Sequence, residues 1–464
     1  MSKKFRNCDL NPAYRLPPSL QDWLPEGHLA RFVADLVETL DLSAIYAKYE
    51  EGDGRGLAAY DPRMMVRLLI YAYSRGVPGS RRIERATHED VAFRYWAADQ
   101  HPDHDTIADF RKEHLAHLAQ LFVQVLKLCQ RAGLVKLGHG ALDGTKVKAN
   151  ASKHKAMSYG RMEETEKKLE AEVQALLQEA ARIDAEEDRK YGKGKRGDEL
   201  PQELARGESR LKKIREAKAA LEAEAKETAK QKQAEVEARL KERERQEEER
   251  GRKLGGKPPQ APNPEEAEPE PKAQRNFTDP DSRIMKDGAT KEFVQAYNAQ
   301  AVVDDQAQVI AAAAVTQEAH DKQQLVPMLE EVEVMTGSKP EQATADAGYF
   351  SEKNVTAPQL AGIDLWVPPD RQKHGKEVPI ATGPPPPGAG VAEQMRHKLR
   401  TPAGRAVYKL RKAVVEPVFG QIKEGRGFRR FLRRGLAQVE AEWKLICATH
   451  NLLKLFQSWS PQRA

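Results

Sequence analysis

The sequence predicts an α/β protein: a mixed-sheet core, an all-helical domain before it, and an inserted helical coiled-coil hairpin. Three observations lead to this prediction. Apolar residues recur at three- and four-residue spacing from residue 28 to 130. Strand and helix patterns then alternate between residues 139 and 456. A highly charged segment, residues 161–250, interrupts that alternation.

Length and composition narrow the class of protein. The chain has 464 residues, 31% of them charged and 39% hydrophobic, with a mean hydropathy of −0.72. This length exceeds one compact core, so several units are expected. No window approaches the roughly 18 to 20 apolar residues of a membrane-spanning helix, and the first residues have no signal-peptide pattern. We therefore expect a cytoplasmic protein without membrane contact.

The three cysteines predict no special chemistry. Cys8, Cys129 and Cys447 lie far apart and form no CxxC pair. Neither a disulfide framework nor a thiolate zinc site is supported, and buried structural thiols are expected.

Residues 1–135 are predicted to form a helical, DNA-binding domain. Asp61 and Pro62 match the N-cap and first position of a helix, and a further helix is expected from about residue 105 to 131. A Gly/Pro turn follows the helix that starts at Pro62, and the next helix begins at Ser80 and carries Arg81 and Arg82. This arrangement fits a helix-turn-helix domain that reads DNA, or an ordinary helical bundle. The His/Asp cluster at 101–105 is interpreted as a loop with a capping Asp rather than a metal site.

Residues 153–275 are predicted to be an insertion. Positions 161–250 hold 23 Lys/Arg and 25 Asp/Glu, too polar for a core of their own. Their sparse apolar residues keep heptad-like spacing on both sides of the breaker YGKGKRGDELP, which predicts an antiparallel coiled-coil hairpin with few contacts to the rest of the chain. The Pro- and Glu-rich stretch after it is expected to be a disordered linker.

The flanking segments, 136–152 and 276–456, are predicted to form one interrupted α/β core. Strands are expected at 139–150, 293–305, 307–315, 341–350 and 363–368, with helices at 321–335, from Ser351, and through 402–456. Three strands, helix, strand, helix, strand, helix is the order of a ribonuclease H-like domain.

Two Asp residues occupy similar contexts at predicted strand ends. Asp143 lies in ALDGTKV and Asp346 in TADAGYFS, and each is followed by small residues that leave room for a ligand. The alternative is that both make ordinary turns, since Asp-Gly is a common turn pair.

A third acid, Glu416, lies on a predicted helix within a strongly basic stretch. Residues 396–434 carry 13 Lys/Arg against two Glu, a net charge of +11, so the rest of the chain sums to 6 − 11 = −5. Such a block fits a polyanion such as nucleic acid, or else a solvated basic helix. Tyr408 and Lys423 share the predicted face of Glu416, although Pro417 can split the helix. The alternative for Glu416 is a surface ion-pair ladder.

Three carboxylates from two strands and a helix could hold two Mg²⁺ ions, with Mn²⁺ as a substitute, for phosphoryl displacement. Basic residues downstream would then hold the phosphodiester backbone.

These motifs together resemble bacterial insertion-sequence transposases of the DDE class, whose catalytic core is ribonuclease H-like. The resemblance rests on YDPRMMVRLLIYAYSRGVPGSRRIE, DGTKVKANAS, NFTDPDSRIMKDG with YNAQAVVD, and TADAGYFS. It also rests on a Tyr-Arg-Glu-Lys signature at Tyr408, Arg411, Glu416 and Lys423, in which the Arg-to-Glu gap is four residues rather than the usual three.

The resemblance implies Mg²⁺-dependent cutting at the ends of a mobile element and attack of the freed 3′-hydroxyls on target DNA. It implies that Asp143, Asp346 and Glu416 are the catalytic metal ligands. Double-stranded DNA is the expected partner, so the protein is expected in the nucleoid, and a homodimer is expected when two ends are joined. The expected DNA-binding residues are Tyr408, Arg411, Lys423, Arg426, Arg429, Arg430, Arg433, Arg434, Arg81 and Arg82.

Two other functions stay open on the sequence. A metal-dependent nuclease of the same fold without strand transfer would share every carboxylate. A non-catalytic DNA-binding coiled-coil scaffold would explain the charge pattern and the insertion, but not the three acids.

Overall fold

The computed structural model describes residues 19–50, 59–191, 202–253, 255–288, 290–371 and 379–459. These residues form two compact units. The core unit comprises residues within Met1–Val147, Asn298–Arg433 and Ala437–Ala464, and the hairpin unit comprises Lys148–Tyr297 with Arg434–Leu436. The helices that precede residue 135 therefore belong to the core unit.

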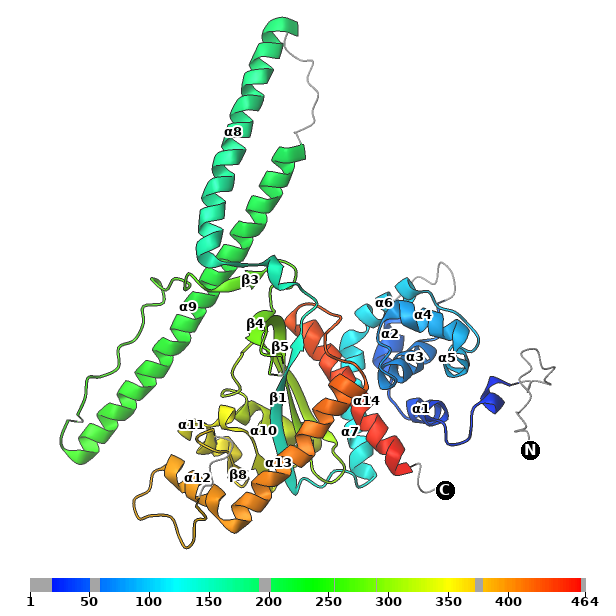
Figure 1. Cartoon of the computed structure of the whole chain (residues 1–464), viewed down its shortest axis with the longest axis vertical. Helices are drawn as coiled ribbons and strands as arrows, with labels where there is room; N and C mark the ends of the chain where they lie inside the picture. The colour runs from blue at the N-terminus through cyan, green and yellow to red at the C-terminus, as the bar shows by residue number, and fades with distance from the viewer. Residues whose placement is uncertain are drawn as a thin grey trace, which may run out of the picture. The chain divides into compact units, whose positions relative to one another are not determined.

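The N-terminal part of the core unit is helical (Figure 1). After a short 3₁₀ turn, Leu20–Trp23, its helices are α1 Leu29–Glu38, α2 Ser43–Glu50, α3 Pro62–Ser74, α4 Ser80–Glu89, α5 Val91–Trp96, α6 His104–Glu113 and α7 Leu115–Arg131. Helix α3 begins as predicted, because the Asp61 carboxylate accepts a hydrogen bond from the Arg63 N–H at 2.7 Å and Pro62 takes the first position. Nearly all of α3 is buried, so it is the central helix of this group.

One helix boundary differs from the prediction. The single helix expected over residues 105–131 is two helices, α6 and α7, which meet at His114. Asp103 caps α6 by accepting from the Thr106 N–H at 2.7 Å. This bond confirms the capping Asp that was predicted within the His/Asp segment 101–105.

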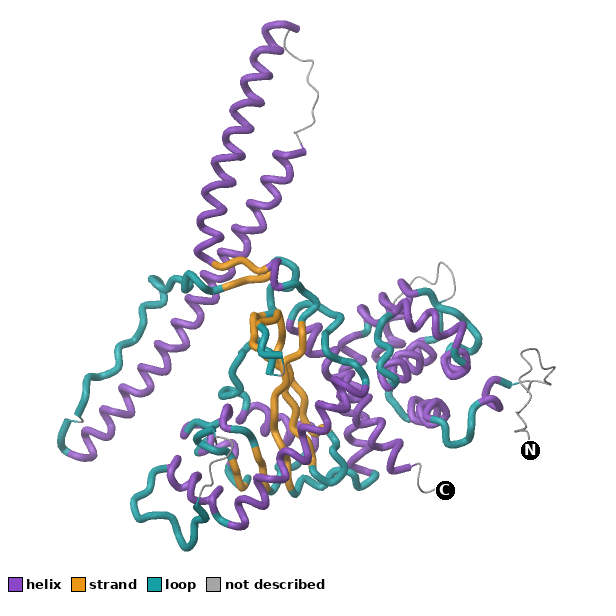
Figure 2. Tube along the Cα trace, viewed as in Figure 1, coloured by secondary structure: helices purple, strands orange, loops and turns teal. Residues whose placement is uncertain are grey.

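The core unit is built on a mixed sheet (Figure 2). Its strands are β1 His139–Lys148, β5 Phe293–Asp304, β6 Ile310–Thr316, β7 Gln342–Thr344 and β8 Asp364–Trp366, in the spatial order β6-β5-β1-β7-β8. Strands β5 and β6 are antiparallel, whereas β1, β7 and β8 are parallel. Helix α10, Leu325–Thr336, packs on this sheet through the predicted face of Leu325, Met328, Leu329 and Val332.

The C-terminal half of the core unit follows a short helix, α11 Glu352–Val355, and consists of α12 Val391–Arg400, α13 Pro402–Gly420 and α14 Leu436–Trp459. Pro417 lies inside α13 without ending it. A turn of π-helix, Gln421–Gly425, follows, and residues 426–435 are not helical, so the helical stretch expected over 402–456 is wrong there. Cys129 and Cys447 are buried free thiols, as predicted, while Cys8 lies outside the described residues.

The hairpin unit contains two long helices, α8 Tyr159–Tyr191 and α9 Gln202–Arg250. Glu166 pairs with Arg215 and Lys218, whereas the earlier residue Tyr159 donates to the later Glu222, so the helices run antiparallel (Figure 1). Their seam is apolar, as the heptad spacing predicted, and consists of Tyr159, Met162, Leu169, Leu211, Ile214, Ala217 and Leu221.

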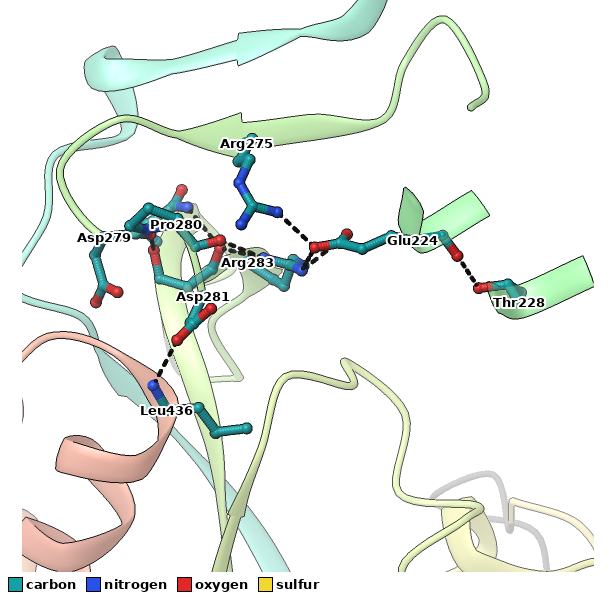
Figure 3. A network of polar contacts seen from close by, with 10 residues as sticks. Glu224, Thr228, Arg275, Asp279, Pro280, Asp281, Arg283 and Leu436 are labelled. Carbon is teal, nitrogen blue, oxygen red and sulfur yellow. Dashed lines mark hydrogen bonds and ion pairs between the residues drawn. The ribbon is translucent and has the colours of Figure 1, made fainter. Parts of the chain in front are cut away.

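The base of the hairpin is fastened to short strands. Strands β2 Ala156–Ser158 and β3 Gln274–Asn276 pair antiparallel, and β4 Arg283–Lys286 pairs with the start of β5. The Glu224 carboxylate of α9 pairs with the Arg275 guanidinium, and with Arg283 at 3.1 Å (Figure 3). Within the hairpin unit, α9 is thus tied to β3 and β4.

The Pro- and Glu-rich segment between α9 and β3 forms no helix or strand over its described residues. It is nevertheless attached at both ends: Arg243 donates to the Gly256 carbonyl at 2.9 Å, and the Gly160 N–H donates to the Pro271 carbonyl at 3.2 Å. In the described part of the chain, no helix is long and apolar enough to cross a membrane.

Candidate active site

Two parallel strands bring the predicted Asp pair together. The last registered pair of β1 and β7 is Ala141 with Thr344. Asp143 and Asp346 each follow that pair by two residues, so they occupy equivalent positions where the strands separate. Their charges interact, and both add to the rise that burial causes in the pKa of the Tyr349 hydroxyl. Asp143 lies inside β1 itself, which continues to Lys148.

Both Asp side chains also accept a hydrogen bond from a backbone N–H close by in the sequence. Asp143 Oδ1 accepts a hydrogen bond from the Gly144 N–H at 2.8 Å. Asp346 caps the 3₁₀ turn Ala347–Tyr349, where its Oδ1 accepts from the Gly348 N–H at 2.7 Å. The turn role that the sequence left as an alternative therefore holds for Asp346, but not for Asp143, which lies within a strand.

The Asp143 carboxyl lies in an unfavourable setting for a negative charge. Burial raises its pKa to about 6, the Arg411 guanidinium opposes that rise, and the negative charges of Asp346 and Asp321 add to it. Asp143 is 21% exposed, which leaves one side of the carboxylate open to a ligand.

Arg411 connects the strand acid to the helix acid. Its Nη1 donates to Asp143 Oδ2 at 2.8 Å, and its Nη2 lies 3.9 Å from Glu416 Oε1. Both acids thus contact one guanidinium through different nitrogens. Arg411 is 10% exposed, whereas Glu416 is 55% exposed. Tyr408 lies beside them, since the Arg411 guanidinium is 5.8 Å from the centre of its ring.

Lys423 holds the end of α13 to the strand that carries Asp143. Its ammonium group donates to Thr145 Oγ1 at 3.1 Å and to the Lys146 carbonyl at 3.0 Å. Two members of the Tyr-Arg-Glu-Lys signature, Arg411 and Lys423, therefore bond to β1 between Asp143 and Lys146. Across the described residues, however, no three His, Cys, Asp or Glu side chains are arranged to hold one ion.

The site also contains polar residues that the sequence analysis did not assign. Asp321 precedes α10, and its Oδ1 accepts from Asn298 at 2.7 Å and Gln300 at 2.9 Å, both on β5. Lys146 lies 3.7 Å from the same oxygen. A signal for this group was present: Asn298 and Gln300 are alternating polar residues in the otherwise apolar strand YNAQAVVD.

The predicted DNA-binding arginines fall into two groups. Arg81, Arg82, Arg429, Arg430 and Arg434 are exposed. Of these, Arg429 pairs with Glu424, and Arg434 donates to the Asn150 carbonyl at 2.9 Å.

Arg426 and Arg433 instead donate hydrogen bonds to other parts of the protein. Arg426 donates to Thr449 Oγ1 at 2.8 Å, and burial lowers its pKa to about 10. Its backbone carbonyl packs on Gly76, whose positive φ of 71° and lack of a side chain permit the contact. Arg433 donates to the Ala108 carbonyl at 3.3 Å.

The motif NFTDPDSR lies in the hairpin unit, where its acids accept hydrogen bonds from Gly435 and Leu436 of the same unit. Asp279 accepts hydrogen bonds from the Tyr297 hydroxyl at 2.8 Å and from the Gly435 N–H at 3.0 Å. Asp281 Oδ2 accepts from the Leu436 N–H at 2.8 Å, which caps α14 (Figure 3). The motif therefore fixes the point where the basic segment 426–434 ends.

Comparison with protein families adds evidence from two regions. Residues 18–113 match a family described as a transposase domain (DUF772), and residues 371–456 match one described as a transposase DDE domain. The second match includes Arg411, Glu416 and Lys423. Comparisons with curated proteins and with solved structures found no match. The two family matches indicate that the chain is an insertion-sequence transposase of the DDE class.

Proposed function

We propose that this transposase cuts DNA at the ends of its mobile element in a divalent-metal-dependent reaction and joins the freed 3′-hydroxyls to target DNA. The observation that carries the proposal is the matched position of Asp143 and Asp346 beyond the last registered pair of two parallel strands. Strand ends of this kind are where α/β sheets place ligands.

The core unit is proposed to be a ribonuclease H-like catalytic domain. The spatial order of the strands, β6-β5-β1-β7-β8, supports this assignment. The order along the chain does so too, because β1, β5 and β6 come before α10 and the parallel strands β7 and β8 follow it. Along the chain we propose a DNA-binding helical part up to residue 135 and a catalytic part from 136–152 and 276–456, with 153–275 as the insertion.

The acidic residues fit a divalent cation in their donor chemistry. Carboxylate oxygens are the ligands that Mg²⁺ prefers, with Mn²⁺ as a substitute. The raised pKa of Asp143 indicates a site where a nearby cation would relieve unfavourable negative charge. Asp143 and Asp346 would hold the ion, and Glu416 would join them once its contact with Arg411 is exchanged. When bound, such ions activate the attacking oxygen and stabilise the leaving oxygen.

The protein's own side chains prepare the site for a DNA end. Arg411 neutralises Asp143 and Glu416 in the absence of DNA, and its guanidinium can transfer to a phosphate when a DNA strand arrives. Lys423 holds α13 against β1, so the helix that carries Glu416 stays near Asp143. Tyr408, beside Arg411, is placed to contact the same strand.

DNA is proposed to bind along the exposed arginines of α4 and the C-terminal segment, namely Arg81, Arg82, Arg429, Arg430 and Arg434. Arg426 and Arg433 would support that surface from within rather than contact phosphates. Since two element ends must be joined, we propose a homodimer on DNA.

A product assay separates transposition from simple nuclease activity. The purified chain is incubated with Mg²⁺, a supercoiled plasmid, and a labelled duplex taken from the boundary of its own element. Transposition predicts label joined covalently to the plasmid through the duplex 3′-end. A hydrolysed duplex with no joined product would favour the nuclease, and DNA binding without cleavage would favour a scaffold.

A further inference from the structure

A carboxylate outside the predicted triad lies between the two Asp motifs. Asp321, in the loop before α10, is far from both motifs in sequence. A side chain at Gly144 would place its Cβ 2.8 Å from Asp321 Oδ1 and 2.9 Å from Asn298 Oδ1. A side chain at Gly348 would place its Cβ 3.5 Å from Asp321 Oδ2. Both glycines that follow the predicted catalytic Asp residues therefore make space for one carboxylate.

The hydrogen bonds of Asp321 run into the buried interior. Its Oδ1 accepts from Asn298 Nδ2 at 2.7 Å and from Gln300 Nε2 at 2.9 Å. Gln300 Oε1 in turn accepts from the Tyr349 hydroxyl. The side chains of Asn298, Gln300 and Tyr349 are fully buried, so these bonds are costly to break.

This hydrogen-bond network connects the strand that carries Asp143 to the turn that carries Asp346. Tyr349 closes the 3₁₀ turn that Asp346 caps, and Gln300 lies on β5 against Gly144. The Gln300 backbone is itself fixed, because its carbonyl accepts from the Trp443 indole N–H at 3.0 Å. A shift of Asp321 would release Gln300, and with it the turn that carries Asp346.

We propose that Asp321 is a positioning residue for the metal site: it holds Asp143 and Asp346 at their spacing through Asn298, Gln300 and Tyr349. The inference rests on the proposed function of the Asp pair. Asp321 acts as a hydrogen-bond acceptor, since its Oδ1 receives two amide donors, and only one oxygen is needed for that role.

Two substitutions of Asp321 distinguish its role as a hydrogen-bond acceptor from a role of its negative charge. Asp321→Asn keeps an oxygen for both amide donors but removes the charge, whereas Asp321→Ala removes both. The readout is Mn²⁺ affinity of the DNA-free protein by electron paramagnetic resonance, together with Mn²⁺-dependent cleavage. We expect Asp321→Ala to weaken Mn²⁺ binding at least tenfold and Asp321→Asn to stay within about threefold of wild type. Asp305→Asn and Asp305→Ala, at an exposed carboxylate in the β5–β6 turn, are the matched controls.

A second variant keeps the test decisive if Asp321→Ala does not fold. Gln300→Met with Tyr349→Phe removes the donor to Asp321 without leaving the tyrosine hydroxyl unpaired. It should reproduce the loss of Mn²⁺ affinity in a protein with wild-type circular dichroism. Wild-type affinity in this double variant would overturn the proposal.

Two further outcomes would overturn the positioning role. Equal losses in Asp321→Asn and Asp321→Ala would show that the charge matters, as for a direct ligand, and wild-type affinity in both would show no role at all. Asp143→Asn is the reference for the proposed function. If that variant binds Mn²⁺ as tightly as wild type, the metal site itself is wrong, whatever Asp321 does.

Discussion

Asp143 and Asp346 lie 203 positions apart in the sequence, yet each follows the same registered pair of adjacent parallel strands by two residues. Between them in the chain lie residues 148–297 of the hairpin unit, strand β6 and helix α10. The equivalence arises because β1 and β7 are parallel neighbours, whose pairing ends just before both Asp residues.

The pH dependence of stability should report on Asp143. Its carboxyl titrates near 3.9 when unfolded and at about 6 when folded. Since the folded pKa is raised, the stabilising contribution is present below the unfolded pKa and is lost as the pH rises through about 6. Relative to Asp143→Asn, the wild-type free energy of unfolding should therefore fall by up to about 3 kcal/mol between pH 4 and 7. Metal-free urea titrations at several pH values measure this, and a pH-independent difference would contradict it.

Glu416→Gln should separate binding from chemistry. The change removes a charge at an exposed position and relieves repulsion toward phosphate, so metal-free DNA affinity should hold or rise slightly. Cleavage with Mg²⁺ should fall by about 100-fold or more, because a ligand charge is lost. Filter binding and single-turnover cleavage measure the two effects. Wild-type cleavage by this variant would assign Glu416 to a surface ion pair with Arg411.

Substitution of exposed arginines should weaken DNA binding, whereas substitution of a buried arginine should lower the stability of the fold. Replacing Arg81, Arg82 and Arg430 together by Ala should weaken binding to any duplex and lower the slope of log affinity against log salt by up to about 0.9 per lost phosphate contact. Arg426→Ala should leave that slope unchanged, but destabilise the fold by about 1 to 3 kcal/mol, since it removes the bond to Thr449. Anisotropy titrations at several salt concentrations and urea unfolding distinguish them. A reduced salt slope in Arg426→Ala would place that guanidinium on DNA.

The cap that Asp281 supplies to α14 should be measurable. Asp281→Ala removes the acceptor for the Leu436 N–H and should destabilise the hairpin unit by about 1 kcal/mol, whereas Asp281→Asn keeps an oxygen for that bond. Hydrogen exchange at the first amides of α14 gives a local readout. Unchanged exchange in Asp281→Ala would show that the cap is dispensable.

Much of the fold followed from periodicity and caps. The strand β5, the Asp61-Pro62 start of α3, the α10 face and the α8–α9 seam follow from local patterns, and the structure confirms each. The break at residues 426–435 was missed, because helix propensity there is overridden by distant partners. Gly435 and Leu436 bond to Asp279 and Asp281, about 155 residues away.

The role of a site residue was harder to predict where it depends on whether the side chain is buried. Arg426 is one cation in a run of many, and its sequence neighbours give no sign that its side chain turns inward to Thr449. Asp321 was expected at the start of the helix predicted over 321–335, whereas α10 begins at Leu325, and only the approach of β5 and both glycines makes Asp321 part of the site. Long-range packing of this kind leaves no periodic signal in one sequence.

The most direct test of the central claim is single-turnover cleavage of the element's own end by the wild-type chain and by Asp346→Asn, with equal DNA binding verified first. We predict that Mg²⁺ or Mn²⁺ supports nicking by wild type, that EDTA abolishes it, and that Asp346→Asn cuts about 100-fold more slowly or worse. Cleavage by Asp346→Asn at the wild-type rate would contradict the claim that the paired strand ends of β1 and β7 form the active site.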